Sequence, residues 1–128
     1  MSEIPEPIVQ RTEYWVSCLP EDDINASAFT LVVRYRGGGR WAVGRGSTSD
    51  VPCMNAAGEW SYGVEWEDEG VEPSTDEEFA SYNRARDEWM DAHRFDEETA
   101  LRLAKQHAPQ MTVNGWTVAD ALARREAS

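Results

Sequence analysis

The chain has 128 residues, of which 41% are hydrophobic, so it can fold around one core and is too apolar to remain unfolded. Its net charge of −12 disfavours direct binding to nucleic acid or to an anionic membrane. That charge is local, because residues 59–98 hold 15 acidic side chains against three arginines and the rest of the chain is balanced. A basic partner is the class of ligand that this distribution favours.

Residues 1–11 contain two prolines and few apolar side chains, which predicts a mobile tail ahead of a single domain over residues 12–128. The tail lacks the basic start and apolar stretch of a secretion signal, and no apolar run is long enough to span a membrane. The two cysteines, Cys18 and Cys53, are therefore expected to be buried thiols rather than a disulfide. We expect a cytoplasmic protein.

The first half of the chain alternates polar and apolar residues, as strands do. The alternation predicts strands over residues 12–19, 28–36, 40–44, 52–54 and 60–67, and it is strictest in the last of these. Gly37, Gly38 and Gly39 form the loop of one predicted hairpin, and residues 55–58 form a tight turn. Together these elements predict an antiparallel meander of four to five strands.

The second half changes to the period of a helix. A long amphipathic helix is predicted to start at Ser74 or Thr75, a second to run from Asp96 to about Ala108, and a third to run from Thr117 to about Arg125. Strands followed by helices predict an α+β domain in which two to three helices pack on one face of the sheet.

The apolar stripe of the long helix is expected to lie in the core. Its members are Phe79, Tyr82, Arg86, Trp89, Met90 and His93. The sheet residues expected to receive this stripe are Phe29, Leu31, Trp60, Tyr62 and Trp66. The basic side chains of the sheet, Arg34, Arg36 and Arg40, are expected to pair with the acidic segment of the chain.

One acidic stretch has the spacing of a calcium loop. Loop positions 1, 3, 5, 6 and 12 are occupied by Glu65, Glu67, Glu69, Gly70 and Asp76. Glutamate replaces the shorter aspartate, Asp76 is short for a bidentate ligand, and Pro73 interrupts the loop. A solvated acidic loop is the preferred interpretation, the calcium site is a weak alternative, and no metal or cofactor is predicted.

The sequence shows no catalytic constellation. Cys18, Cys53, His93 and His107 lack the short spacing of structural zinc ligands. Cys53 and His93 could form a thiolate pair if the fold brought them together. A small enzyme is therefore an alternative without assigned catalytic residues.

The function that these features favour is a non-catalytic accessory protein that binds a basic protein partner. The candidate contact residues are the acidic side chains of the long helix and its flanks, with two tryptophans expected to be exposed: Glu77, Glu88, Asp91, Glu67, Glu69, Glu98, Trp15 and Trp116. A first alternative is a DNA mimic, in which carboxylates about 7 Å apart replace phosphates. A second is an acidic face kept only for solubility.

Three stretches of the chain resemble small acidic proteins of high-GC Gram-positive bacteria and their phages. They are residues 18–25 (CLPEDDIN), residues 53–60, and residues 111–125 (MTVNGWTVADALARR). No activity is assigned to those proteins, so the resemblance implies a phage or mobile-element accessory protein and no particular site residue.

Overall fold

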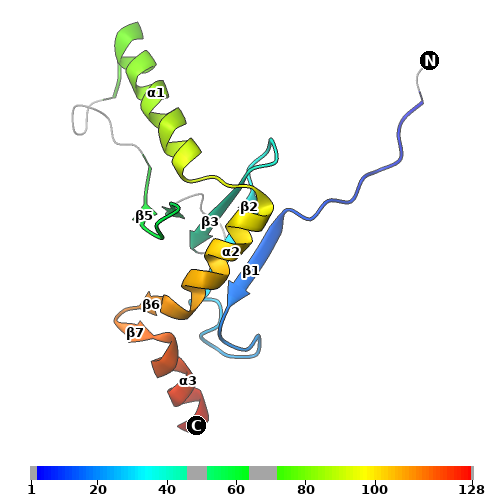
Figure 1. Cartoon of the computed structure of the whole chain (residues 1–128), viewed down its shortest axis with the longest axis vertical. Helices are drawn as coiled ribbons and strands as arrows, with labels where there is room; N and C mark the ends of the chain where they lie inside the picture. Colours follow the sequence, from blue (N-terminus) through cyan, green and yellow to red (C-terminus); the bar gives the residue numbers. More distant parts are fainter. Residues whose placement is uncertain (1–2, 46–51, 64–71, 128) are drawn as a thin grey trace.

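The computed structural model describes residues 3–45, 52–63 and 72–127. Within these ranges one antiparallel sheet contains five strands that are neighbours in chain order: β1 (Glu13–Ser17), β2 (Thr30–Tyr35), β3 (Trp41–Arg45), β4 (Cys53–Met54) and β5 (Trp60–Ser61). The helices follow in the C-terminal half (Figure 1). The α+β class and the meander are therefore confirmed.

The helical half contains α1 (Asp76–Ala92), α2 (Glu97–His107), a short 3-10 turn η1 (Ala108–Gln110), the hairpin of β6 (Thr112–Val113) and β7 (Trp116–Thr117), and α3 (Val118–Ala127). Each predicted N-cap is present. The Thr75 hydroxyl accepts the Glu78 N–H at 3.1 Å, and the Asp96 carboxylate accepts the Thr99 N–H at 2.7 Å. Thr117 and Asp120 exchange hydrogen bonds in a capping box.

The core lies between one face of the sheet and the two later helices. Alternate strand residues point into it, among them Leu31, Val33, Val43 and Met54, each at most 1% exposed. The helices contribute small or aliphatic side chains to the same cluster: Ala100, Leu103, Ala104, Val118 and Ala121. Alanines allow α2 to lie close against the sheet, which it crosses in Figure 1.

Helix α1 does not enter this core. It leads away from the sheet in Figure 1, none of its residues is buried, and Phe79 is 43% exposed. The prediction that its aromatic stripe packs into the core is therefore wrong. The face that carries Leu31 and Val33 is occupied by α2 instead, whose core residues are small or aliphatic whereas the stripe of α1 is aromatic.

The last turns of α1 lie on the opposite face of the sheet. Trp89 and Met90 line a cleft with Ala42 and Cys53, whose strand neighbours Val43 and Met54 point into the core. The indole N–H of Trp89 donates to the Ser61 hydroxyl at 2.7 Å. Tyr62, which was expected to receive the stripe, lines the same cleft but is 78% exposed.

The segment between α1 and α2 carries the chain around the edge of β3. The backbone N–H of Phe95 donates to the Trp41 carbonyl at 2.8 Å, and the Trp41 N–H donates to the Phe95 carbonyl at 2.6 Å. Strand β4 pairs with β3 at Gly44, and Phe95 pairs with the same edge of β3 at Trp41. This bridge explains how two consecutive helices reach opposite faces of one sheet.

Two strand predictions need correction. The strand predicted over residues 60–67 ends at Ser61, and residues 64–67 lie outside the described part of the chain. Strand β1 ends at Ser17, so Cys18 is exposed rather than buried, whereas Cys53 is buried as expected; both are thiols.

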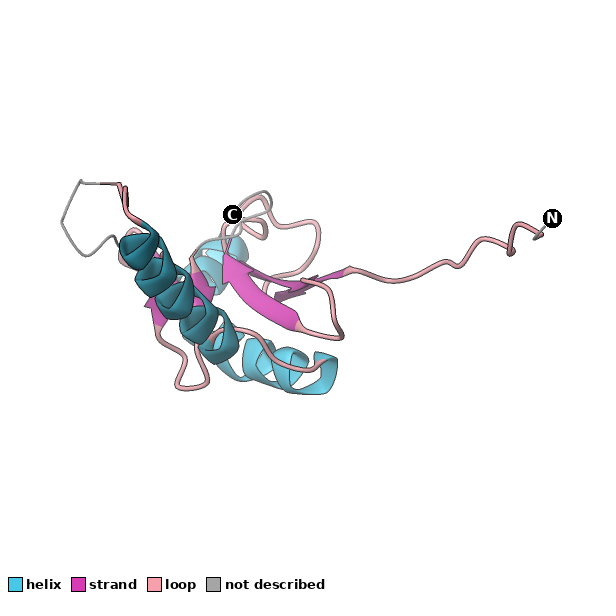
Figure 2. Ribbon diagram, turned by 90° about the horizontal axis from the view of Figure 1, so that it is seen from above, coloured by secondary structure: helices cyan, strands magenta, loops and turns pink. Residues whose placement is uncertain are grey.

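The turns match their glycines. Gly37, Gly38 and Gly39 all have positive φ, as the predicted loop requires. Gly58 has a φ of +82°, and a Cβ atom there would lie 2.3 Å from Cε1 of His107, so the β4–β5 turn lies directly against the end of α2. Ahead of β1, residues 3–12 form no helix or strand and run away from the domain (Figure 2). The mobility of this tail stays a prediction.

Candidate functional site

The outer stripe of α1 is acidic and exposed. Glu77, Glu88 and Asp91 fall within one narrow face of the helix at 100° per residue, and all three are exposed. Arg84 lies on the same stripe between Glu77 and Glu88, which are about 16 Å apart along the axis. The carboxylates therefore form separate patches rather than an even row.

The C-terminal patch is partly neutralised by the protein itself. Arg40 Nη1 lies 2.8 Å from Asp91 Oδ1, and Arg40 Nη2 donates to the carbonyl oxygens of Asp91 at 3.2 Å and Arg94 at 3.0 Å. The expected pairing of a sheet arginine with the acidic segment is confirmed for Arg40. Arg34 instead pairs with Glu13 on the neighbouring strand.

The N-terminal end of α1 combines charge with an exposed aromatic ring. Asp76, Glu77 and Glu78 occupy the first turn, where the helix dipole favours acidic side chains. Glu78 also accepts the Ser74 N–H at 2.9 Å, which completes the cap. Phe79 follows directly and is 43% exposed.

Several candidate residues cannot be placed. Glu65, Glu67, Glu69 and Gly70 of the calcium hypothesis lie outside the described residues, and Asp76 is the exposed first residue of α1. Among the residues that the structure describes, no group of three or more His, Cys, Asp or Glu is arranged to hold a metal ion. Glu98 is exposed in the first turn of α2, which is remote in sequence from the acidic turn of α1.

A cleft of about 270 Å³ lies where α1 meets the sheet. Cys53 and His93 both line this cleft, and their pairing as thiolate and imidazole stays a prediction. His93 is 7% exposed, its ring stacks on Trp89 with centroids 4.4 Å apart, and its Nδ1 lies 2.7 Å from the Trp89 carbonyl oxygen. That carbonyl requires Nδ1 to carry the proton, so the imidazole is oriented by helix α1. Sequence reasoning did not predict the arginines that line the same cleft: Arg36, Arg86 and Arg94.

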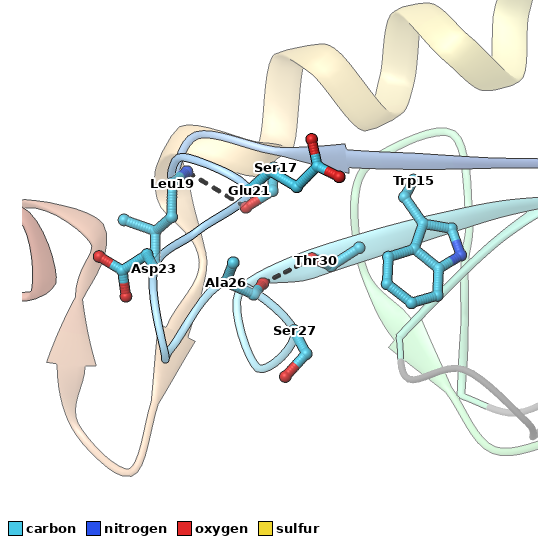
Figure 3. A pocket seen from close by; sticks show the side chains of 8 residues that line it. All are labelled: Trp15, Ser17, Leu19, Glu21, Asp23, Ala26, Ser27 and Thr30. Carbon is cyan, nitrogen blue, oxygen red and sulfur yellow. Dashed lines mark hydrogen bonds between the residues drawn. The ribbon is translucent and has the colours of Figure 1, made fainter.

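A second cleft, of about 430 Å³, lies beside Trp15 (Figure 3). Its walls come from β1, the β1–β2 loop and the start of β2: Trp15, Ser17, Leu19, Glu21, Asp23, Ala26, Ser27 and Thr30. They include two carboxylates and no basic side chain. The Asp23 side chain is 4% exposed; its Oδ1 accepts the Asn25 N–H at 2.7 Å, and its Oδ2 lies 3.5 Å from Arg125 Nη1.

Trp15 is held in place by its own strand. The residue is 59% exposed, and its indole N–H donates to Glu13 Oε2 at 2.7 Å. The pKa of the Glu13 carboxyl lies below its ordinary value. The hydrogen bond from Trp15 is the main cause, and the hydrogen bond from Arg34 is the second. Glu13 therefore stays ionised and fixes the plane of the indole. The predicted exposure of Trp15 is confirmed, but its role in binding stays a prediction.

Trp116, the other tryptophan expected on the surface, is 46% exposed. The Arg124 guanidinium lies over its ring at 5.3 Å from the centroid, so one face of the indole is already covered. The two residues line a smaller cleft of about 190 Å³ with Asn25 and Phe29. Of Trp15 and Trp116, Trp15 therefore offers the more accessible ring.

The chain matches no protein-family model, no curated protein and no solved structure. Among the described residues, no helix is long and apolar enough to cross a membrane. Assignment of a function consequently depends on the surfaces and clefts themselves.

Proposed function

We propose that this protein binds a basic protein partner through the N-terminal half of α1, which leads away from the sheet. The observation that supports the proposal most directly is an exposed aromatic ring, Phe79, beside the acidic side chains of the first helical turn. Aromatic anchors surrounded by charge are typical of protein interfaces. The carboxylates of Glu77 and Glu88 would steer a basic partner, and Phe79 would supply apolar contact.

The arrangement of charge favours general complementarity over imitation of DNA. Arg84 interrupts the acidic stripe, and Asp91 is paired with Arg40 at 2.8 Å. An even row of carboxylates at the phosphate spacing is what a mimic needs. A face kept only for solubility would not require an exposed phenylalanine directly after the acidic first turn of the same helix.

The test is capture from a lysate of the source organism, followed by affinity measurement with the purified partner. The wild type is compared with a variant carrying Glu77→Gln and Glu88→Gln, and with Phe79→Ala. A matched control removes the same charge from the exposed tail through Glu3→Gln and Glu6→Gln. We expect both α1 variants to weaken binding about tenfold and the tail control to leave it unchanged.

Salt dependence separates the alternatives. Charge steering predicts that affinity falls as ionic strength rises from about 0.05 to 0.5 M, because exposed charges are screened. A partner that is released from DNA by this protein, and that does not respond to Phe79→Ala, would favour a DNA mimic. A partner retained equally by every α1 variant would place the interface elsewhere and contradict the proposal.

A further inference from the structure

Strand β1 forms a free edge of the sheet within the described part of the chain. Thr12 lies opposite Tyr35 in the β1–β2 register, and the Tyr35 N–H donates to the Thr12 carbonyl at 2.8 Å. Because bonded and non-bonded pairs alternate in an antiparallel ladder, residues 14 and 16 also bond to β2. Glu13, Trp15 and Ser17 consequently direct their backbone N–H and C=O groups away from the sheet.

The side chains of the same three residues lie on the face that holds the Trp15 cleft. Glu13, Trp15 and Ser17 alternate with Tyr14 and Val16, which pack against the core from the other face. Trp15 and Ser17 therefore contribute both to the free edge and to the wall of the cleft. A strand added beside β1 would direct every second side chain to the face that holds the cleft, and one of these would lie next to Trp15.

The cleft is suited to a positive charge. Its polar walls are two carboxylates and three hydroxyl groups, and it has no lysine or arginine. The charge of Asp23 is partly balanced by Arg125 at 3.5 Å, whereas Glu21 is exposed and has no ion pair among the described residues. Trp15, whose indole N–H donates to Glu13 at 2.7 Å, forms the wall of the cleft at the end away from Asp23 (Figure 3).

We propose that an extended segment of a protein partner adds to the free edge of β1 and places one arginine side chain in the Trp15 cleft. Backbone hydrogen bonds to Glu13, Trp15 and Ser17 would hold the segment in register. The planar guanidinium would stack on the indole and donate to the Glu21 carboxylate. This site is separate from α1 and does not depend on the function proposed for that helix.

The probe is a blocked heptapeptide, Thr-Val-Thr-Arg-Thr-Val-Thr, and its control carries citrulline in place of arginine. Citrulline keeps the shape and hydrogen-bonding plane of arginine but removes its charge. Binding is followed by two-dimensional amide NMR of the full chain. We expect the arginine peptide to bind about tenfold more tightly than the citrulline peptide.

The pattern of shifted signals reports the mode of binding. Edge addition predicts that the outward amides of residues 13, 15 and 17 move, with the Trp15 indole N–H, more than those of residues 14 and 16. Trp15→Ala and Glu21→Gln should each weaken binding about fivefold or more, while Glu3→Gln removes the same charge without effect. The spectrum of each variant shows whether it is folded.

Each contrary result overturns the proposal. Equal affinity for the citrulline peptide would exclude recognition of the cation, and equal movement of all five β1 amides would exclude edge addition. Binding lost through Glu77→Gln and Glu88→Gln but retained by Trp15→Ala would move the basic segment to α1. No binding of the arginine peptide, or binding only of a neutral oligosaccharide at Trp15, would remove the protein segment as the occupant.

Discussion

Helices α1 and α2 follow each other in the chain, but only α2 packs into the core of the sheet. Helix α2 buries Ala100, Leu103 and Ala104, whereas α1, although longer, buries none of its 17 residues. The difference lies in their apolar residues. Small and aliphatic side chains allow α2 to approach the strands closely, while the stripe of α1 is aromatic and contains Arg86. An amphipathic stripe identifies a helix, but it does not identify the surface that covers the stripe.

The largest contrast should appear when one apolar side chain is truncated in each helix. Leu103→Ala removes a side chain that is 6% exposed and leaves a cavity, so we expect a loss of about 2–4 kcal/mol in the free energy of unfolding. Phe79→Ala removes a larger side chain that is 43% exposed, and we expect less than about 1 kcal/mol. Urea unfolding of the two variants beside the wild type measures both values. Similar losses would show that the N-terminal half of α1 is packed against the rest of the protein in solution.

Most of the local structure could be predicted because it depends on neighbouring residues. Thr75, Asp96 and the Thr117–Asp120 pair cap their helices as their spacing requires, and the three glycines form their hairpin loop. The sheet order also follows from short connections between consecutive strands. Local chemistry alone decides each of these features.

The position of α1 could not be predicted in this way. The apolar stripes of α1 and α2 could each have covered the same face of the sheet, so the outcome depended on contacts between residues far apart in sequence. The pairing of Trp89 with Ser61 spans 28 residues, and the Trp41–Phe95 bridge that redirects the chain has no sequence signal that we could recognise. Aromatic side chains are usually buried, so the composition of the α1 stripe predicted a core position, and that prediction was wrong.

The Trp15 cleft was missed for a related reason. Its carboxylates, Glu21 and Asp23, lie in a loop that was predicted only as a polar turn, and its floor comes from two strands. One signal was available in the sequence. Trp15 occupies the polar face of an alternating strand, between Glu13 and Ser17, where a tryptophan has no core to enter.

A smaller effect should follow from releasing the C-terminal end of α1. Arg40→Ala removes the ion pair to Asp91 and two hydrogen bonds to backbone carbonyls, and we expect it to cost about 1 kcal/mol. Asp91→Asn removes only the exposed ion pair and should cost less than about 0.5 kcal/mol. Hydrogen exchange should show faster opening of the last turn of α1 in Arg40→Ala alone. Equal exchange in the two variants would mean that the carboxylate, rather than the carbonyls, fixes the helix.

The smallest effect should come from the N-caps. The cap of α2, Asp96, is charged and depends on pH, whereas the cap of α1, Thr75, is neutral and does not. The pKa of Asp96 lies below the ordinary value of 3.8. The hydrogen bond from the backbone N–H of Thr99 is the main cause, and the one from its hydroxyl is the second. Because the folded pKa is the lower one, this stabilisation is complete above pH 3.8 and is lost as the pH falls through the depressed pKa. Asp96→Asn keeps a capping oxygen but not the charge, so its melting temperature should fall less than that of the wild type on acidification below pH 4.

Thr75→Ala supplies the matched change in α1, because it removes an N-cap that carries no charge. We expect it to reduce helicity by circular dichroism at every pH and to leave the melting temperature within about 1 °C, since the turn it caps contributes nothing to the core. A melting temperature that falls by several degrees in Thr75→Ala would mean that α1 and α2 unfold as one unit. The contrast between the two helices would then be one of exposure alone and not of stability.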